Sequence, residues 1–224
     1  MHNVASIREY FINELKSENF CTDRNGGKTI ELIGASFIAD EESIFGTVNK
    51  DYVESEIRWY SMESTNINDI YGGEKEPPAA WKMTANQHGE INSNYGHLIW
   101  SESLFDQYEH VFAELQDNPD SRRGSMIYTR PSIWKEYNQN GKNDFICTNS
   151  VTYYIRDEIL HCVVQMRSND VIFGYKNDYA WQSFVLHMLA SDLGIETGNI
   201  YWQVQNLHVY EKHFNLVNEE PKNV

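Results

Sequence analysis

Cys147 is the side chain with the clearest potential for covalent chemistry in this sequence, because a cysteine thiolate is an intrinsically strong nucleophile. Downstream of it, Arg167 and Ser168 place a guanidinium and a hydroxyl side by side, which suits the binding of a phosphate. Asp178 follows, with a carboxylate that can accept hydrogen bonds from a nucleotide base. Together these residues provide the parts needed to hold a nucleoside monophosphate and to attack its ring.

Burial in the core is the more common explanation for a lone cysteine, because cysteine is among the most buried residue types. We expect that inert role for Cys21 and Cys162. The number of cysteines is odd and none is arranged as Cys-x-x-Cys, so the sequence predicts neither a disulfide framework nor a zinc site. No metal is expected, and the expected state is a cytoplasmic protein with free thiols.

Composition and charge limit the classes of partner. The 224 residues, 41% of them hydrophobic, are enough to bury one core, so a single domain over residues 1–224 is expected. The formal net charge of -15 would repel a polyanion, so no nucleic-acid partner is expected, although a local basic cluster could still bind one small phosphate. A mean hydropathy of -0.59 and the lack of a long apolar run argue against a membrane span.

The hydrophobic pattern predicts an α+β architecture. Apolar residues recur at helical spacing in four segments, residues 4–15, 52–62, 104–115 and 179–193. β-Branched and aromatic residues favour strands at residues 29–39, 125–130, 151–155, 159–166 and 201–210. Residues 72–78, which include paired glycines and paired prolines, are expected to form a surface loop. We therefore expect a mixed β-sheet flanked by helices.

Several other polar residues have an ordinary structural explanation when each is taken alone. Arg122 and Arg123 lie on a turn between a helix and a strand, where arginines are usually solvated. His208 and Tyr210 alternate along a strand and therefore project from the same face, as any such pair would. Glu56 lies on a helix, where a glutamate usually faces solvent. These residues gain a functional interpretation only from a wider pattern.

That wider pattern is a resemblance to the thymidylate synthase family, and more locally to the branch of the family that hydroxymethylates deoxycytidylate in T-even-type bacteriophages. The segments that carry the resemblance lie at residues 28–31, 33–37, 89–96, 126–132, 167–174 and 208–210. They follow the family's order along nearly the whole chain. The resemblance implies a thymidylate synthase-like fold that dimerises through its sheet, and a nucleotide and a folate as substrates.

The resemblance also implies catalytic roles. Cys147 would be the nucleophile that adds to C6 of the base, and Tyr95 would help to remove the proton from C5. Glu56, which precedes Trp59 in the family's Glu-x-x-Trp spacing, would organise water and proton transfers around the base. The one-carbon unit would come from 5,10-methylenetetrahydrofolate.

The resemblance further implies a set of phosphate-binding residues. Arg167 and Ser168 would contact the phosphate directly, and Arg24 lies in the loop whose family counterpart closes over it. Arg122 and Arg123 match the paired arginines that reach across the dimer to the neighbouring subunit's nucleotide. If that role carries over, the protein must be a homodimer to work.

The sugar and the folate would be bound by other residues. His208 and Tyr210 match the histidine and tyrosine that hydrogen-bond the 3′-hydroxyl of the sugar. Trp81 falls where the family has a tryptophan beside the folate, and Asp170 matches the aspartate that contacts the pterin. The preference for deoxyribose over ribose rests on the resemblance alone.

Asp178 would decide which base is bound. Thymidylate synthases have an asparagine at this position, whose amide pairs with O4 and N3–H of uracil. Cytosine presents the opposite pattern, a donating N4 amine and an accepting N3, which suits a carboxylate with a shared proton. Two alternatives remain: Asn177 or Asp178 could be the N-cap of a helix that begins at Tyr179, or Asn177 could occupy the base-reading position.

The expected activity is the transfer of a one-carbon unit to C5 of dCMP, followed by hydration to 5-hydroxymethyl-dCMP. Two departures from the synthase pattern bear on it: Thr148 replaces the histidine that usually follows the nucleophile, and residues 218–224 do not resemble the tail that closes over the folate. The alternatives are synthase-like methylation of dUMP or dCMP, and a catalytically idle relative that binds RNA. The charge of -15 counts against the idle relative. For a viral chain, the expected location is the host cytoplasm.

Overall fold

The computed structural model describes residues 2–23 and 26–218. The chain groups into two compact units, a sheet unit of residues 1–49 and 153–224 and a helical unit of residues 50–152. The strands form one eight-stranded mixed sheet in the order β1-β3-β8-β6-β5-β4, with β2 paired to β3 and β7 paired to β8. The predicted α+β class, a mixed sheet with flanking helices, is confirmed.

The sheet unit contains most of the strands. They are β1 (His2–Asn3), β2 (Cys21–Thr22), β3 (Lys28–Ile38), the end of β5 (Thr148–Arg156), β6 (Ile159–Met166), β7 (Asn169–Asp170) and β8 (Glu196–Tyr210), and the 3-10 turn η4 (Glu211–Leu216) follows β8. β3 runs antiparallel to β8, whereas β6 and β7 run parallel to it. In the pairing of β3 with β8, Tyr210 lies opposite Thr29 and His208 lies opposite Glu31. Because β8 pairs with β3, β6 and β7, it is the strand around which this unit is organised.

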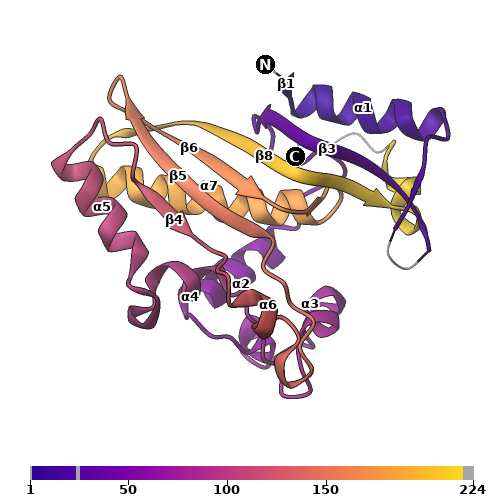
Figure 1. The fold of residues 1–224 in the computed structure, drawn as a ribbon, viewed down its shortest axis with the longest axis horizontal. Coiled ribbons are helices and arrows are strands. Elements are labelled where there is room, and N and C mark those ends of the chain that lie inside the picture. The colour runs from indigo at the N-terminus through magenta and orange to yellow at the C-terminus, as the bar shows by residue number, and fades with distance from the viewer. Residues whose placement is uncertain (1, 24–25, 219–224) are drawn as a thin grey trace. The chain divides into compact units, whose positions relative to one another are not determined.

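Helix α1 (Val4–Lys16) lies along β3 (Figure 1). Asn3 caps its first turn, because the side-chain oxygen of Asn3 accepts a backbone N–H of that turn. Val4, Ile7 and Phe11 recur at helical spacing and are buried, so one side of the helix packs inward. The predicted helix over residues 4–15 is confirmed.

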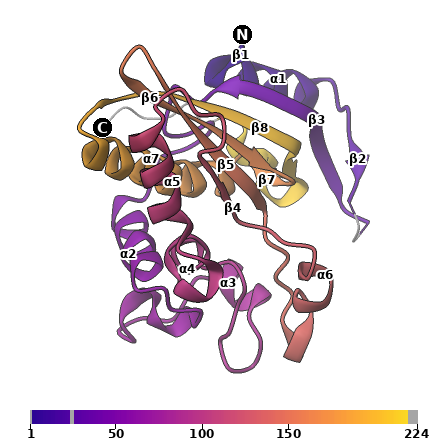
Figure 2. The same cartoon turned by 60° about the vertical axis from the view of Figure 1, so that its left-hand side comes forward.

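Helix α7 (Gly174–Leu193) runs along β6 and β8 (Figures 1 and 2). It begins earlier than the predicted start at Tyr179. The reason is Asp170, whose Oδ1 accepts the three backbone N–H groups that lead into the helix. Asp178 therefore lies inside the helix, and the alternative that made Asn177 or Asp178 its N-cap is wrong.

The helical unit carries short helices and the pairing of β4 with β5 (Figure 2). Its elements are α2 (Lys50–Ser61), η1 (Ile67–Tyr71), α3 (Ala79–Thr84), α4 (Tyr95–Trp100), η2 (Glu102–Leu104), α5 (Gln107–Asp117), β4 (Ser125–Ile127), α6 (Ile133–Glu136) and η3 (Gln139–Gly141). Gly96 is needed where α4 approaches α2, because a Cβ there would lie 1.9 Å from the carbonyl oxygen of Tyr60. The glycine thus allows Tyr95 to stand directly against α2.

The predicted elements agree with the structure in type and differ at their ends. The strand expected over residues 125–130 stops at Ile127, and the helix expected from Leu104 begins at Gln107, while residues 72–78 form the expected loop. The sequence pattern does not predict α3, α4 or α6, because each has at most 6 residues, too few for helical periodicity to show. No helix within residues 2–23 and 26–218 is both long and apolar enough to cross a membrane.

Candidate active site

The three cysteines occupy different environments. Cys147 lies just before β5 and is half-buried, with its Sγ 3.8 Å from the carbonyl oxygen of Phe145. Cys162 is fully buried in β6, and burial raises the pKa of its thiol, so its predicted place in the core is confirmed. Cys21 is exposed, and the same prediction is wrong for it, because both residues of the two-residue strand β2 face solvent.

Tyr95 begins helix α4 and is buried among aromatic rings. Its ring stacks on that of Tyr60, with centroids 5.4 Å apart, and meets Tyr128 edge to face at 5.2 Å. The hydroxyl of Thr148, the residue after Cys147, donates to the phenol oxygen of Tyr95 at 3.0 Å. The helical unit therefore brings the strand of the predicted nucleophile against the predicted proton-removing tyrosine.

A buried carboxylate ties the same two segments together. Asp144 accepts the backbone N–H groups of Asn92 and Ser93 at 2.6 and 2.8 Å, and the hydroxyl of Ser93 at 2.6 Å. These three donors replace the water that an ionised carboxylate loses on burial. Asp144 thereby links the segment that leads to Cys147 with the loop that leads to Tyr95.

Glu56 is buried on helix α2 rather than solvated. The hydroxyl of Tyr52, one turn earlier on the same helix, donates to Oε1 of Glu56. The indole N–H of Trp81 lies within hydrogen-bond distance of two acceptors, Oε1 of Glu56 at 3.1 Å and the phenol oxygen of Tyr52 at 3.0 Å. The three side chains form one cluster within the helical unit, called the Glu56 cluster below.

Burial raises the pKa of the Glu56 carboxyl to about 7, because the loss of solvation outweighs the hydrogen bonds from Tyr52 and Trp81 that stabilise the charged form. The pKa of Tyr52 is raised above its ordinary value because the phenol is buried and faces Glu56. Tyr52 therefore remains a hydrogen-bond donor near neutral pH. A carboxyl that titrates near neutrality is suited to exchange protons with water in general acid–base catalysis.

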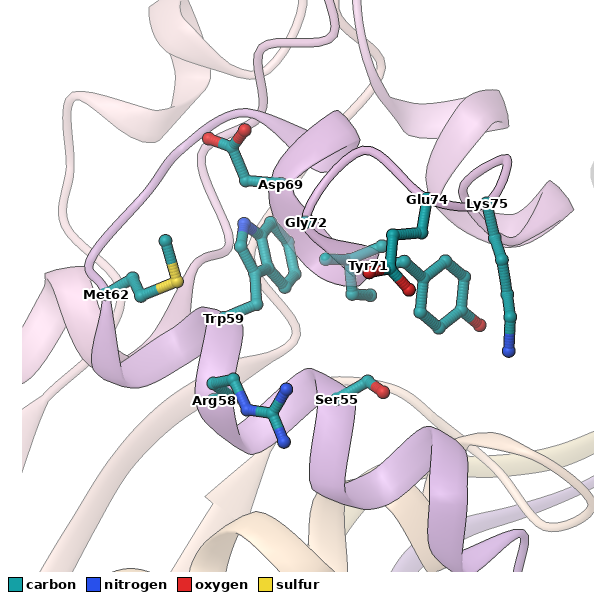
Figure 3. Close-up of a pocket in the computed structure, with 10 residues that line it drawn as sticks. Ser55, Arg58, Trp59, Met62, Asp69, Tyr71, Gly72, Glu74 and Lys75 are labelled. Carbon is teal, nitrogen blue, oxygen red and sulfur yellow. The ribbon is translucent and has the colours of Figure 1, made fainter.

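The helical unit contains a pocket of about 220 Å³, and Trp59 is one of the residues that line it (Figure 3). The charged side chains around it are two cations, Arg58 and Lys75, and two acids, Asp69 and Glu74, so the pocket has no net preference for an anion or a cation. No residue predicted to bind the nucleotide or the folate lines it. We therefore do not assign a substrate to this pocket.

Asp178, in the sheet unit, is held by a neighbouring amide. The side-chain nitrogen of Asn169 donates to Oδ2 of Asp178 at 2.7 Å. The side-chain oxygen of Asn169 accepts the indole N–H of Trp202 at 3.3 Å, which fixes the end of the amide that faces Asp178. Gly174 allows this approach, since a Cβ there would lie 3.0 Å from the Asn169 nitrogen.

The two carboxylate oxygens of Asp170 have different environments. Oδ1 accepts the backbone N–H groups at the start of α7. Oδ2 is buried and accepts no hydrogen bond from the described part of the chain. Buried polar atoms normally have a partner, so Oδ2 is suited to a donor supplied by a ligand.

The predicted sugar and phosphate residues lie close together in the sheet unit. His208 and Tyr210 project from the same face of β8, as predicted, with their ring centroids 4.8 Å apart. Arg167 and Ser168 are half-buried in the connection between β6 and β7. The backbone N–H of Asn206 donates to the carbonyl oxygen of Arg167 at 3.2 Å, which attaches this connection to the strand that carries His208.

The arginines predicted to act across a dimer lie on the turn after α5. Arg122 and Arg123 are both exposed. Arg123 forms a salt bridge with Glu114 at 3.0 Å, whereas Arg122 forms none with the residues described in the structure. Arg24 lies outside the described residues.

Comparison with known proteins identifies the family. A family model of thymidylate synthase matches residues 13–223. The chain belongs to the thymidylate synthase family. It is 52% identical over 221 residues to the deoxycytidylate 5-hydroxymethyltransferases of Enterobacteria phages T4, T2 and T6, a match that covers 96% of this chain and 89% of each relative. It is 27% identical over 208 residues to the thymidylate synthase of Buchnera aphidicola subsp. Acyrthosiphon pisum (strain APS), covering 88% and 76%.

The fold agrees with this family membership. The solved thymidylate synthase from T4 phage superimposes with a TM-score of 0.77, covering 97% of this chain and 82% of that chain. At 20% sequence identity this similarity concerns the fold alone. The predicted thymidylate synthase-like fold is confirmed, whereas dimerisation through the sheet stays a prediction.

The predicted site residues that the structure describes fall into two groups. The helical unit holds Cys147, Glu56, Tyr95, Trp81, Arg122 and Arg123. The sheet unit holds Arg167, Ser168, Asp170, Asp178, His208 and Tyr210. The first group offers a nucleophile, a phenol and a carboxyl that titrates near neutrality. The second contains the residues predicted to bind the phosphate, the sugar, the base and the pterin.

Tyr52 and Asn169 hydrogen-bond to predicted site carboxylates and were not themselves predicted to belong to the site. Tyr52 could have been found, since Tyr52 and Glu56 stand at positions i and i+4 of a predicted helix, where side chains meet. The role of Asn169 depends on Asp178, nine residues away, and on Trp202, 33 residues away. The one signal for Asn169 in the sequence is its position within residues 167–174, a segment that resembles the thymidylate synthase family.

Proposed function

We propose that this protein is a deoxycytidylate 5-hydroxymethyltransferase that takes its one-carbon unit from 5,10-methylenetetrahydrofolate. The observation that carries the proposal is the 52% identity, over 96% of the chain, to three phage enzymes of that name. It favours this activity over methylation of dUMP or dCMP. The products are 5-hydroxymethyl-dCMP and tetrahydrofolate, and we place the enzyme in the cytoplasm, that of the host if the chain is viral.

Asp178 selects cytosine in this proposal. One lone pair of its Oδ2 accepts the Asn169 amide, and a carboxylate offers further lone pairs to the N4 amine of cytosine. A proton shared between the carboxyl and N3 makes the second contact. Uracil would set its O4 lone pairs against the same carboxylate, and a polar mismatch of this kind discriminates by about 10⁴ to 10⁵-fold in favourable sites.

Cys147 starts the reaction by covalent addition. Its thiolate forms a bond to C6 of the base, and the electron pair of the C5–C6 double bond becomes nucleophilic at C5. C5 then bonds to the one-carbon unit that the folate cosubstrate supplies. His208 and Tyr210 hold the 3′-hydroxyl of the sugar, while Arg167 and Ser168 hold the phosphate.

Tyr95 and Glu56 complete the reaction. Tyr95, acting through ordered water, helps to remove the proton from C5, and tetrahydrofolate leaves, so that an exocyclic methylene remains on the base. Glu56 positions the water that adds to this methylene, and its pKa of about 7 allows it to take up and return the proton. Breaking of the bond between Cys147 and C6 restores the aromatic ring.

The chain offers groups that suit a folate. The buried Oδ2 of Asp170 accepts no hydrogen bond from the described residues and matches the N–H donors of a pterin. Trp81 presents an indole whose N–H is already oriented by the Glu56 cluster. We assign Asp170 to the pterin and Trp81 to a position beside the folate.

The working assembly in this proposal is a homodimer that pairs through the sheet. Arg122 and Arg123 complete the phosphate site of the neighbouring subunit, together with Arg24 and Arg167 of that subunit itself. The exposure of Arg122 and Arg123 is compatible with this role. Arg123 would exchange its exposed pairing with Glu114 for the phosphate, a small loss because exposed ion pairs contribute little.

The test is tritium release from dCMP and from dUMP, each labelled at C5, with 5,10-methylenetetrahydrofolate present. We expect release from dCMP, a hydroxymethyl product by mass and no dihydrofolate. The matched control is Cys147→Ser, which should abolish release but still bind dCMP in equilibrium dialysis, because the phosphate and sugar contacts survive. A methyl product with dihydrofolate, or a preference for dUMP, would overturn the proposal.

A further inference from the structure

We propose that Tyr52 is a positioning residue of this enzyme, whose hydroxyl fixes one oxygen of the Glu56 carboxylate so that the other can hold the water that ends the reaction. The inference deepens the proposed function and rests on it. Tyr52 touches neither of the reacting carbons in this scheme. It acts through Glu56.

The hydrogen bonds around Glu56 are one-sided. Tyr52 and Trp81 both donate to Oε1, whereas no described residue donates to Oε2. A carboxylate held at one oxygen by two donors cannot rotate without breaking both bonds. Oε2 is therefore the oxygen that can accept from, or donate to, a water molecule.

Tyr52 reaches Glu56 because of its place on the helix. The two residues stand at positions i and i+4 of α2, where side chains lie one above the other on the same face. The Tyr52 oxygen also lies 3.0 Å from the indole N–H of Trp81, so its own orientation is set from α3. A phenylalanine at this position would keep the ring packing and lose only the hydroxyl.

The hydrogen bond from Tyr52 also opposes the effect of burial on Glu56. Burial raises the pKa of Glu56, and the bonds from Tyr52 and Trp81 lower it, with a net value of about 7. The titratable groups that face Glu56 are the phenols of Tyr52 on α2 and Tyr71 on η1, and α3 adds only the neutral indole. Loss of the Tyr52 hydroxyl should therefore raise the pKa of Glu56 further.

The first measurement is the Glu56 pKa itself, in the full-length protein without substrates. The infrared carbonyl stretch of the protonated carboxyl, identified by its absence in Glu56→Gln, is followed as a function of pH. In Tyr52→Phe we expect the midpoint to move upward by about one pH unit, since hydrogen bonds to charged groups have roughly that effect on a pKa. An unchanged midpoint would overturn the inference, whatever the substrate of the enzyme proves to be.

The second measurement is the pH dependence of hydroxymethyl-dCMP formation. In Tyr52→Phe the acid limb of kcat should move upward with the Glu56 midpoint, so that the rate at pH 6 falls about tenfold and largely recovers at pH 9. KM for dCMP should not change, because Tyr52 makes no contact with the nucleotide in this scheme. A uniform loss at every pH would indicate a purely structural role and contradict the inference.

Two further variants separate the hydrogen bond from the packing. Tyr71→Phe removes a second phenol near Glu56, one that forms no hydrogen bond with the Glu56 carboxylate. In this variant the acid limb of the kcat profile should stay at the wild-type pH. Replacement of Tyr52 by 3-fluorotyrosine makes the phenol a stronger hydrogen-bond donor at nearly constant shape. The acid limb of the kcat profile should then move to lower pH. If the wild-type enzyme does not act on dCMP, the proposed function fails, while the infrared titration still decides the role of Tyr52.

Discussion

The hydroxyl of Thr148 donates a hydrogen bond to the phenol oxygen of Tyr95 at 3.0 Å. Thr148 directly follows the predicted nucleophile Cys147, so neighbouring backbone positions carry that thiol and a hydrogen-bond donor to Tyr95, the tyrosine predicted to help remove the C5 proton. Because Thr148 donates, the proton of the Tyr95 phenol must be directed at a different acceptor. The residue that replaces the synthase histidine thus has a defined partner.

Replacing Thr148 by valine should slow proton removal from C5. Valine keeps the shape of threonine and removes the hydroxyl, so Tyr95 loses a buried donor and its phenol is less well oriented. We expect tritium release from dCMP to fall about tenfold, the effect of one hydrogen bond of roughly 1 to 1.5 kcal/mol in the transition state. Thr148→Ser, which keeps the hydroxyl, should stay near the wild-type rate, and equal rates for all three proteins would remove Thr148 from the mechanism.

Asp178→Asn should exchange the preferred base. The amide no longer offers two acceptors to cytosine, whereas it can donate to O4 of uracil, so dCMP turnover should be lost and some turnover of dUMP should appear. Competition between the two nucleotides in one tritium-release assay measures the change directly. Asn177→Asp, which alters the neighbouring residue, serves as the control for an alignment displaced by one position. Unchanged dCMP turnover in Asp178→Asn would show that Asp178 does not read the base.

Glu56→Gln should stabilise the protein at alkaline pH while it abolishes hydroxymethylation. The pKa of Glu56 is raised from an ordinary value of 4.5 to about 7, so the folded state binds more protons than the unfolded state between these values. Stability linked to Glu56 is therefore present below about pH 4.5 and is lost as the pH rises through 7. Urea unfolding at pH 8.5 should find the glutamine variant more stable by about 2 to 3 kcal/mol, with a smaller difference at pH 5.

Asp144→Asn should destabilise the helical unit. The N–H groups of Asn92 and Ser93 both bind Oδ2, so the amide oxygen of an asparagine could keep them, but its NH2 group would replace Oδ1, the acceptor of the Ser93 hydroxyl. The Ser93 hydroxyl then loses its acceptor, and the two remaining N–H bonds no longer go to a carboxylate. We expect urea unfolding to show a loss of about 2 to 4 kcal/mol, as for other broken networks of buried hydrogen bonds. Asp117→Asn at the exposed end of α5 is the matched control and should change stability by no more than about 0.5 kcal/mol. Equal stability of the two variants would contradict this view of Asp144.

The sequence by itself determined the family and most of the longer helices and strands, and it predicted which residues carry the chemistry. The order of segments around Cys147, Arg167 and His208 predicted the family, and alternation along residues 201–210 predicted that His208 and Tyr210 share a face, because these signals are local in the chain. Helices and strands of ordinary length followed from their periodicity for the same reason. Short helices such as α4, which begins at Tyr95, did not.

Only the tertiary structure decided how the site residues are paired and charged. The bond from Asn169 to Asp178 is oriented by Trp202, 33 residues from Asn169, and the buried Glu56 lies beside Trp81, 25 residues away. Desolvation and hydrogen bonding depend on such long-range contacts, which local patterns do not encode. Glu56, a helix glutamate of the kind that usually faces solvent, is therefore a buried carboxyl with a pKa of about 7.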